Sequence, residues 1–350
     1  MNDLVKIAFY YGAGRIFIPL PRFFIFNPTR RCDLACQHCG VWKSEKKIEL
    51  SSDELRELLK NKLFQKIEVV WLSGGEPSLR KDLAELTEVF NQSLPKMQIL
   101  GMASNGYNSE RIILRCREML QKLNPAKQGF FLHLSLDGIG EPHNKIRGKE
   151  DAFENLIKTI DRFKKLKEEF PCHRLELGFN CVIQKGNYFQ LKEIFEFAQS
   201  QSASITFNLV EITDQYYSNI ELAQSLSLSP DEKQAVIEFL KEIINKLPAG
   251  YKSHYKSLIS ILSGKRRTRR CLSLYSTVVI DSDGSWIPCP LSSNWQKVNF
   301  LQVSAEKFWK SKTTRELRKR IQKQLCPKCG LSCSLGDSLS ISEFLRGGFE

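Results

Sequence analysis

Three cysteines near the start of the chain, Cys32, Cys36 and Cys39, are separated by three and by two residues. This spacing lets one loop present three thiolates to an iron–sulfur cluster. A structural zinc ion takes four protein ligands, and the segment supplies no fourth cysteine; its histidine, His38, stands between two of the cysteines. Three ligands leave one iron open to a cofactor or substrate, which is a catalytic arrangement.

A second group of cysteines lies near the end of the chain and consists of Cys271, Cys289, Cys326, Cys329 and Cys333. With no signal peptide in evidence, clustered cysteines are expected to bind metal and not to form disulfides. Four cysteines fit an iron–sulfur cluster, but a zinc knuckle stays open, because spacing alone does not separate the two. Cys116, Cys172 and Cys181 stand singly and are predicted to be ordinary buried thiols.

The elements that must position these groups alternate along the first two thirds of the chain. Short apolar runs predict strands over residues 23–26, 67–72, 98–103, 130–136, 175–182 and 204–210. Amphipathic stretches predict helices over residues 51–64, 81–91, 110–122, 151–169 and 188–200. The pattern is typical of an α/β fold, a partial (β/α)6 TIM-like barrel. Such a barrel binds ligands at the carboxyl ends of its strands, and the first cysteine group follows the first strand.

Four segments are predicted. They are an N-terminal segment over residues 1–22, a core over 23–211, a helical connector over 212–268 and a small C-terminal cysteine-rich auxiliary-cluster domain over 269–350. Ser229 and Pro230 predict the start of a connector helix that ends near residues 248–250. Residues 277–280 and 285–287, joined by a turn at Asp283 and Gly284, predict a hairpin between Cys271 and Cys289.

Composition and charge predict a folded protein with an anionic partner. Hydrophobic residues make up 42% and charged residues 26% of the chain, close to globular averages. No apolar run approaches the roughly 20 residues that cross a bilayer, so a cytoplasmic protein without a transmembrane segment is expected. The net charge is +13, and a basic run precedes Cys271: Lys265, Arg266, Arg267, Arg269 and Arg270. A solvated loop is the alternative, and nucleic acid is disfavoured because no aromatic residues are interleaved there.

Short polar segments follow the next three predicted strands. Residues 73–77 read Ser-Gly-Gly-Glu-Pro, residues 104–106 read Ser-Asn-Gly, and residues 135–138 read Ser-Leu-Asp-Gly. Taken singly, each fits a tight turn or a helix cap. Their order and positions, together with the cysteine triad, resemble the radical S-adenosylmethionine (SAM) superfamily across about 190 residues.

The resemblance implies a SAM-binding 4Fe-4S cluster on the cysteine triad and a set of SAM contacts. It implies that the glycines and Glu76 receive the SAM amino group, that Arg147 meets the carboxylate, and that His38 lies over the adenine. The residues that it assigns to the cofactor site are His38, Gly74, Gly75, Glu76, Ser104, Asn105, Ser135, Asp137 and Arg147. As a group, such enzymes take an electron from a carrier such as flavodoxin or ferredoxin and cleave SAM to a 5′-deoxyadenosyl radical, which abstracts a substrate hydrogen.

The second cysteine group resembles the auxiliary-cluster domains called twitch and SPASM. The resemblance implies a single auxiliary 4Fe-4S cluster held by Cys271, Cys289, Cys326 and Cys329, with Cys333 as a substitute ligand or a spare. In related sulfatase-maturing enzymes an acidic base follows the cysteine of the Gly-x4-Cys turn, whereas this chain has Pro290. No catalytic residue is therefore assigned. Other polar groups expected near the barrel mouth are Asn180, Asn208, Glu211 and Asp214, of which the two carboxylates could equally lie on the surface.

Two classes of substrate fit this sequence. Oxidation of a small molecule, with the auxiliary cluster accepting an electron, suits a single auxiliary cluster and the basic balance of charge, and we expect it. Peptide or protein side-chain modification, as in ribosomal peptide maturation, is the alternative; peptide-modifying relatives often carry an N-terminal leader-binding domain, and about 25 residues precede the first predicted strand. A non-catalytic iron–sulfur or zinc binding module is a remote third reading.

Overall fold

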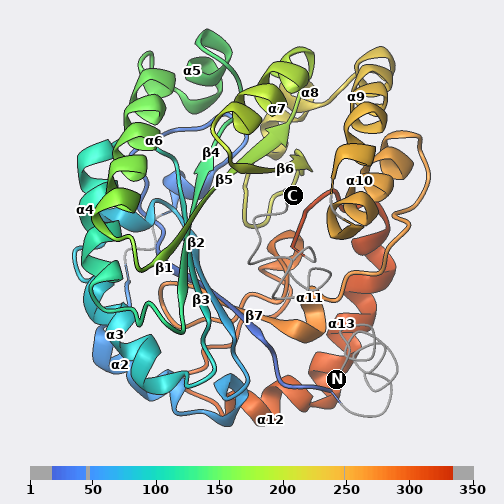
Figure 1. Cartoon of the computed structure of the whole chain (residues 1–350). Helices are drawn as coiled ribbons and strands as arrows, with labels where there is room; N and C mark the ends of the chain where they lie inside the picture. The colour runs from blue at the N-terminus through green and yellow to red at the C-terminus, as the bar shows by residue number, and fades with distance from the viewer. Residues whose placement is uncertain (1–17, 45–47, 248, 334–350) are drawn as a thin grey trace.

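The computed structural model describes residues 18–44, 48–247 and 249–333, and its centre is a curled sheet of seven parallel strands (Figure 1). The strands are adjacent in the order β6, β5, β4, β3, β2, β1, β7. Six of them lie where the sequence predicts strands: β1 (Phe23–Thr29), β2 (Val69–Gly74), β3 (Ile99–Ser104), β4 (Gly129–Ser135), β5 (Arg174–Ile183) and β6 (Ser204–Leu209). The partial barrel is confirmed, and its parallel strands direct all their carboxyl ends to one rim.

The seventh strand, β7 (Thr277–Ile280), comes from the region predicted to form a separate hairpin. It pairs in parallel with β1, with Phe24 opposite Val278. Residues 285–287 form no strand of the sheet, but they complete the predicted hairpin: Ile280 bridges Trp286 in the antiparallel sense, and the Ile287 N–H donates to the Val279 carbonyl at 2.9 Å. β7 belongs to both the hairpin and the sheet, because an apolar strand buries more surface at the edge of a large sheet than in a two-stranded ribbon alone. The cysteine-rich region thus contributes a strand to the barrel wall.

Helices cover the convex face of the sheet (Figure 1). They are α2 (Ser52–Leu59), α3 (Leu83–Ser93), α4 (Ser109–Leu120), α5 (Glu141–Arg147), α6 (Ala152–Glu169) and α7 (Leu191–Ser200). Ser51 caps α2 in a reciprocal arrangement with Glu54, in which each side chain accepts the other residue's backbone N–H. The predicted helix over 51–64 is split, since α2 ends at Leu59 and a short 3-10 turn, Lys62–Phe64, follows. The sequence did not predict α5.

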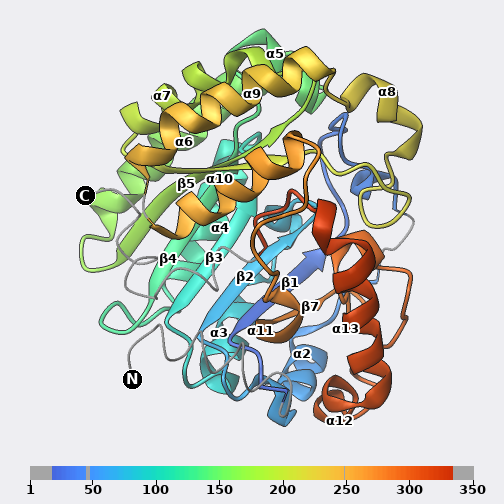
Figure 2. The ribbon, with the colours of Figure 1, turned by 90° about the vertical axis from the view of Figure 1, so that its right-hand side faces the viewer.

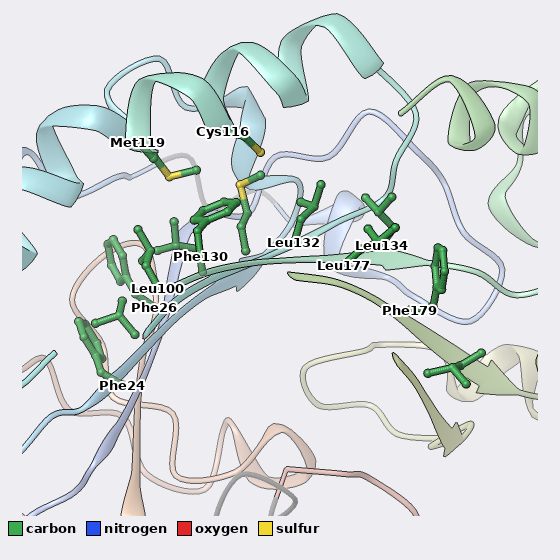
Figure 3. Close-up of a cluster of buried hydrophobic side chains, with 14 of the residues drawn as sticks. Phe24, Phe26, Leu100, Cys116, Met119, Phe130, Leu132, Leu134, Leu177 and Phe179 are labelled. Atoms are coloured by element: carbon green, nitrogen blue, oxygen red, sulfur yellow. The ribbon is translucent and has the colours of Figure 1, made fainter. Parts of the chain in front are cut away.

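The hydrophobic core lies between this sheet face and the helices (Figure 3). Phe24 of β1, Leu100 of β3 and Phe130 of β4 are fully buried. Figure 3 shows Met119 and Cys116 of α4 above Phe130 and Leu132. Because each strand alternates its side chains between two faces, the same strands present other residues to the concave side of the barrel.

The three single cysteines differ in their environments. Cys116 and Cys181 are fully buried, as predicted. Cys172 is exposed, contrary to the prediction, because it lies in the turn that follows α6. Apolar neighbours in the sequence did not place it in the core.

The predicted connector contributes α8 (Ala223–Leu226), α9 (Pro230–Ile243) and α10 (Ala249–Leu262). As predicted, Ser229 caps α9 and Pro230 occupies its first position. Beside the edge strand β6, the Tyr255 hydroxyl of α10 lies 3.3 Å from the Ile205 carbonyl and accepts the Phe207 N–H at 3.2 Å. The connector therefore closes one side of the barrel.

His254, the neighbour of Tyr255 on α10, predicts a pH dependence of stability. It is 2% exposed, its Nε2 lies 2.8 Å from the Phe207 carbonyl, and burial lowers its pKa from 6.5 to about 4. Because the pKa is lower in the folded than in the unfolded protein, protonation favours unfolding. The free energy of unfolding is therefore highest above pH 6.5 and falls as the pH drops towards 4, by about 2 kcal/mol between pH 7 and 4.5. His254→Gln keeps a donor but does not titrate. In urea denaturation at the two pH values, the variant should lose less stability than wild type; equal losses would contradict this.

The remaining helices are α11 (Ser273–Ser276), α12 (Ala305–Lys310) and α13 (Lys312–Gln324). Figure 2 shows α12 and α13 at the edge of the molecule beyond β7. Arg318 joins them, because its guanidinium donates to the carbonyls of Leu274 (2.7 Å) and Trp309 (2.8 Å) and lies 4.2 Å from the Trp309 ring centroid. The buried side of α13 is thereby fixed against its neighbours and its other side faces outward.

Most of the predicted N-terminal segment, residues 1–17, lies outside the described residues. Of the remainder, Pro19 accepts a hydrogen bond from the Trp309 indole at 3.0 Å. No helix in the described ranges is long and apolar enough to cross a membrane.

Candidate functional site

The loop after β1 carries Cys32, Cys36 and Cys39 to one cavity of about 440 Å3, whose walls include the carboxyl ends of the central strands. The Cys39 N–H donates to the Cys36 carbonyl at 3.1 Å, which closes the turn between them. The Asn219 side chain donates to the His38 carbonyl at 2.8 Å and braces the loop from the far side. The structure therefore brings the three predicted ligands to one wall.

The glycine segment at the end of β2 is hydrogen-bonded to the start of this cysteine loop. The Gly75 N–H donates to the Thr29 carbonyl (2.9 Å) and the Glu76 N–H to the Arg31 carbonyl (2.8 Å). Gly74 adopts a φ of 101°, which favours glycine, and both glycines line the cavity. The backbone of this segment can therefore approach a ligand closely.

Gly75→Ala is expected to weaken SAM binding about tenfold or more. A Cβ on Gly75 would lie 2.1 Å from the Arg31 carbonyl oxygen, so the glycine segment and the cysteine loop must separate. Gly129→Ala is the matched control, because its Cβ would meet no atom closer than 3.4 Å. Calorimetric titration of SAM into reconstituted proteins measures the effect. Unchanged affinity in the Gly75 variant would contradict it.

Glu76 is fully buried and is not among the residues that line the cavity. It accepts hydrogen bonds from the Ser104 hydroxyl (3.0 Å), the Asn105 N–H (2.8 Å) and the Ser78 N–H (3.2 Å). Burial raises the pKa of its carboxyl. In this structure Glu76 fixes the end of β2 against the end of β3, and the predicted contact with SAM stays a prediction.

Ser104, Asn105 and Ser135 do line the cavity. The Asn105 side chain donates to the Asp33 carboxylate at 2.7 Å and lies 3.8 Å from the Cys32 sulfur. The ends of β3 and β4 thus present short polar groups to the cavity that the cysteine loop borders.

A buried ion pair links the fourth strand's polar segment to the cysteine loop. Asp137 is fully buried, pairs with Arg147 at 2.5 Å and accepts the Val182 N–H at 2.8 Å. Arg147 lines the cavity and donates to the Cys36 sulfur at 3.5 Å. Burial lowers the pKa of this guanidinium, but Asp137 and Cys36 outweigh that effect and raise it, so Arg147 stays charged. Asp137 thus holds Arg147, and Arg147 faces the site.

Arg147 is the last residue of α5, the helix that the sequence analysis missed. Pro142 in its first turn and Gly148, at a φ of 72° just beyond its end, are the ordinary start and stop signals of a helix. Reading those signals would have placed Arg147 at the end of a short helix and not in a loop.

His38 lines the cavity next to the cysteines and is 9% exposed. Its Nδ1 lies 3.1 Å from the Gln184 amide nitrogen, which can only donate, so the ring proton is on Nε2. Burial lowers the pKa of the ring to about 4, and it is neutral at neutral pH. A flat neutral ring on the wall is chemically suited to stacking on an adenine, which remains a prediction.

The cysteine triad fits an iron–sulfur cluster. Burial raises the pKa of Cys32 to about 12 and of Cys39 to about 11, so iron would displace protons that these thiols otherwise keep. The buried Nε of Arg147 has no hydrogen-bond partner, which leaves a donor for a sulfur-rich group. Thiolates around one zinc stand about 3.8 Å apart. In the described ranges no three His, Cys, Asp or Glu groups converge on one ion, whereas a cube offers each thiolate its own iron.

The five C-terminal cysteines form a second group, since burial and the nearby Cys333 raise the pKa of the Cys289 thiol, and the four others lie outside the cavity. The Cys271 and Cys326 sulfurs share a hydrogen bond, which lowers the pKa of Cys271 to about 6 and raises that of Cys326. Cys289 and Cys329 also raise the pKa of Cys326, as expected of nearby thiolates. None of the four lines the cavity. This grouping fits the predicted auxiliary ligand set.

Cys333 differs from the other four because it is exposed and lines the same cavity as the cysteine triad. The chain that precedes it is hydrogen-bonded to the end of β6. The Gly330 N–H donates to Glu211 at 2.5 Å and the Ser332 N–H to Asn208 at 2.6 Å. The cysteine-rich segment therefore forms part of the cavity wall.

Of the four polar residues predicted near the barrel mouth, three line the cavity and one does not. Glu211, Asn180 and Asn208 line the cavity, and burial raises the pKa of Glu211 to about 7. Asp214 is exposed and does not line it. The alternative that both carboxylates are surface groups therefore holds for Asp214 only.

The sequence analysis missed Trp71 of β2 and His133 of β4, which line the cavity with ring centroids 4.8 Å apart. Both belong to the concave face of the sheet. The alternation of side chains along a strand could have identified Trp71: its neighbours Val70 and Leu72 are fully buried and point to the helix-covered face, so Trp71 points to the concave face.

Two family models match this chain. The model of the radical SAM superfamily matches residues 26–197, and that of the SPASM iron–sulfur cluster-binding domain matches residues 271–334. They cover the two regions that carry the two cysteine groups.

Several curated proteins are similar in sequence. Fe-coproporphyrin III synthase of Methanosarcina barkeri is 29% identical over 51% of this chain and 41% of its own length. The AdoMet-dependent heme synthase of that organism is 24% identical over 88% of this chain and 91% of its own length. The subtilosin biosynthesis protein AlbA of Bacillus subtilis is 23% identical over 91% and 68%. The chain spans less than half the length of the first curated relatives it matches.

Solved structures share the fold. SuiB of Streptococcus suis, bound to SAM, superposes with a TM-score of 0.62 and 15% identity over 99% of this chain and 79% of that one. The enzyme anSMEcpe, with bound AdoMet and a peptide, superposes with a TM-score of 0.58 and 16% identity over 93% and 98%.

Proposed function

Because the chain belongs to the radical SAM superfamily and carries a C-terminal SPASM iron–sulfur domain, we propose that it is an oxidoreductase that removes a hydrogen atom from a small molecule. Its cofactors are SAM, a SAM-binding 4Fe-4S cluster and an auxiliary iron–sulfur cluster. One observation carries the proposal: the cysteine triad, the glycine segment and Cys333 border a single cavity. The segment that carries the last cysteine of the second group therefore lies beside the first group.

Cys32, Cys36 and Cys39 would hold the first cluster, and Cys271, Cys289, Cys326 and Cys329 the second. When bound, the reduced first cluster and SAM supply reductive cleavage of the SAM carbon–sulfur bond and a 5′-deoxyadenosyl radical. Arg147 and Asn105 direct N–H groups towards the sulfurs of Cys36 and Cys32, which stabilises negative charge on these ligands. The enclosing walls keep water and stray hydrogen donors from the reacting groups.

The auxiliary cysteines would serve as the electron-accepting side of the reaction. Four cysteine ligands leave no open iron to anchor a substrate, which favours electron transfer as the role of this cluster. Hydrogen loss followed by electron loss amounts to a two-electron oxidation of the substrate. Glu211 and Cys333 lie on the wall between the two cysteine groups.

A small-molecule substrate is supported by the similarity to the AdoMet-dependent heme synthase, which extends over most of both chains. The second candidate, modification of a peptide side chain, is favoured by the similarity to AlbA over 91% of this chain. The peptide-bound structural neighbours are below 25% identity and support the fold only.

Anaerobic reconstitution followed by iron and sulfide analysis and a dithionite-driven SAM cleavage assay tests the proposal. We expect about eight irons per chain and release of 5′-deoxyadenosine. An iron-containing tetrapyrrole and a cysteine-containing peptide, offered separately, distinguish the two substrate classes by mass change. If the protein with all its iron bound releases no 5′-deoxyadenosine, the proposal is wrong and the chain is a non-catalytic iron–sulfur or zinc binding module.

A further inference from the structure

We propose that the outward face of α13 and the segment before Cys271 form a docking surface for an acidic one-electron carrier protein. This basic face consists of Lys265, Arg266, Arg270, Lys312, Arg315, Lys319, Arg320, Lys323 and Lys328, all of which are exposed. The inference rests on the proposed function, since it takes the auxiliary cysteines to hold a redox-active cluster.

Among the residues that the structure describes, the basic face carries almost no compensating negative charge. Along α13 the exposed cations recur every three or four residues, while Thr314, Leu317, Arg318 and Ile321 are buried. Its one exposed carboxylate within the helix, Glu316, pairs with Lys312 at 4.0 Å. Uncompensated charges of one sign on a rigid helix attract a partner of the opposite sign and speed its association.

Hydrogen bonds place the two parts of the face side by side. The Arg270 guanidinium donates to the Gln322 side chain of α13 at 3.2 Å. The Arg267 N–H donates to the Pro327 carbonyl at 2.8 Å. The basic run, which the sequence left open between a solvated loop and a binding site, thus extends the charged face of α13.

The face borders the auxiliary cysteines and not the SAM side of the cavity. α13 ends at Gln324, and Cys326 follows after one intervening residue. Lys323 is separated from Cys326 by at most about 11 Å of chain, and Lys328 stands between Cys326 and Cys329. A protein bound here would have its own redox group close to these ligands.

The electron balance of the proposed oxidation gives such a partner a role. SAM cleavage takes one electron from the first cluster, and the substrate then loses a hydrogen atom to the adenosyl carbon, one electron to the auxiliary cluster and a proton to solvent. A reduced flavin or iron–sulfur carrier docked at this face supplies the electron for cleavage, and its oxidised form accepts the substrate electron whenever that electron does not return to the first cluster. A nucleic acid or an anionic membrane would fit the charge but not this role.

The test compares two triple variants of the reconstituted holoenzyme. Arg315→Gln, Lys319→Gln and Lys323→Gln together remove three of the nine positive charges of the basic face while keeping good helix formers. Lys164→Gln, Lys165→Gln and Lys167→Gln do the same on the exposed side of α6, which Figures 1 and 2 place far from α13. Calorimetry with a recombinant flavodoxin should show about tenfold weaker binding for the first variant, strong weakening with salt, and no change for the α6 variant.

The assay also separates this inference from the proposed function. The α13 variant should keep dithionite-driven release of 5′-deoxyadenosine and lose most flavodoxin-driven turnover. If neither reductant supports release in wild type, the proposed function fails. Equal flavodoxin affinity in wild type and both variants would overturn the docking surface. The docking surface would also be overturned if wild type bound no flavodoxin but bound a single-stranded oligonucleotide or phosphatidylserine vesicles, and the α13 variant lost that binding.

Discussion

Replacing Cys32, Cys36 and Cys39 together by alanine is expected to halve the iron content, from about eight to about four per chain, and to abolish release of 5′-deoxyadenosine. The three thiols line one cavity, and their loop contains no other described cysteine that could replace them as ligands. The auxiliary group lies behind the wall, so its irons should remain. Iron and sulfide analysis with the dithionite-driven assay measures both effects.

Two control variants make this prediction specific. Cys172→Ser removes an exposed thiol outside both groups and should change neither iron content nor SAM cleavage. Replacing Cys271, Cys289 and Cys326 by alanine should leave the irons that bind SAM. If the first triple variant kept all its iron, or if the second lost all of it, the division into two independent ligand sets would be wrong.

Arg147→Met is expected to lower the free energy of unfolding by about 3–5 kcal/mol, because it leaves the Asp137 carboxylate buried without its partner. Asp137 is fully buried and Arg147 is 5% exposed, so water cannot replace the lost charge. The variant also loses the N–H that faces Cys36, and we expect it to retain less iron after reconstitution. Urea denaturation of the apoprotein measures the first effect separately from the second.

The matched variants are Asp137→Asn alone and in combination with Arg147→Met. Removing both charges should restore part of the stability that the single arginine variant loses, since no uncompensated charge then remains. Strictly additive losses in this cycle would show that the two residues do not act as a pair. A loss below about 1 kcal/mol in Arg147→Met would mean that water reaches the carboxylate.

The sequence by itself determined the barrel and its chemistry. Apolar runs of strand length between amphipathic stretches located six strands, because a parallel sheet covered by helices needs apolar residues in that pattern. The cysteine triad and the three polar segments fell after successive strands, so their convergence on one rim followed from the parallel topology. Cysteine spacing likewise separated two ligand groups along the chain.

Tertiary structure alone decided which of these residues face the cavity. Glu76 and Asp137 belong to matching segments, yet neither lines the cavity, because the hydrogen bond to Asn105 and the ion pair to Arg147 hold their carboxylates in the buried layer. The hydrogen bonds that attach the segment of Cys333 to the end of β6 bring this cysteine alone of its group to the cavity.

The sequence also could not decide where the cysteine-rich region belongs. Its short strand β7 was predicted as half of a hairpin, which the structure contains, but a local pattern carries no information on a second partner about 250 residues away. Burial of apolar area at the open edge of the barrel adds the pairing with β1 to the hairpin. The same docking places α13 with its basic side outward, next to the auxiliary cysteines, because contacts distant in sequence decide which side of a helix is covered.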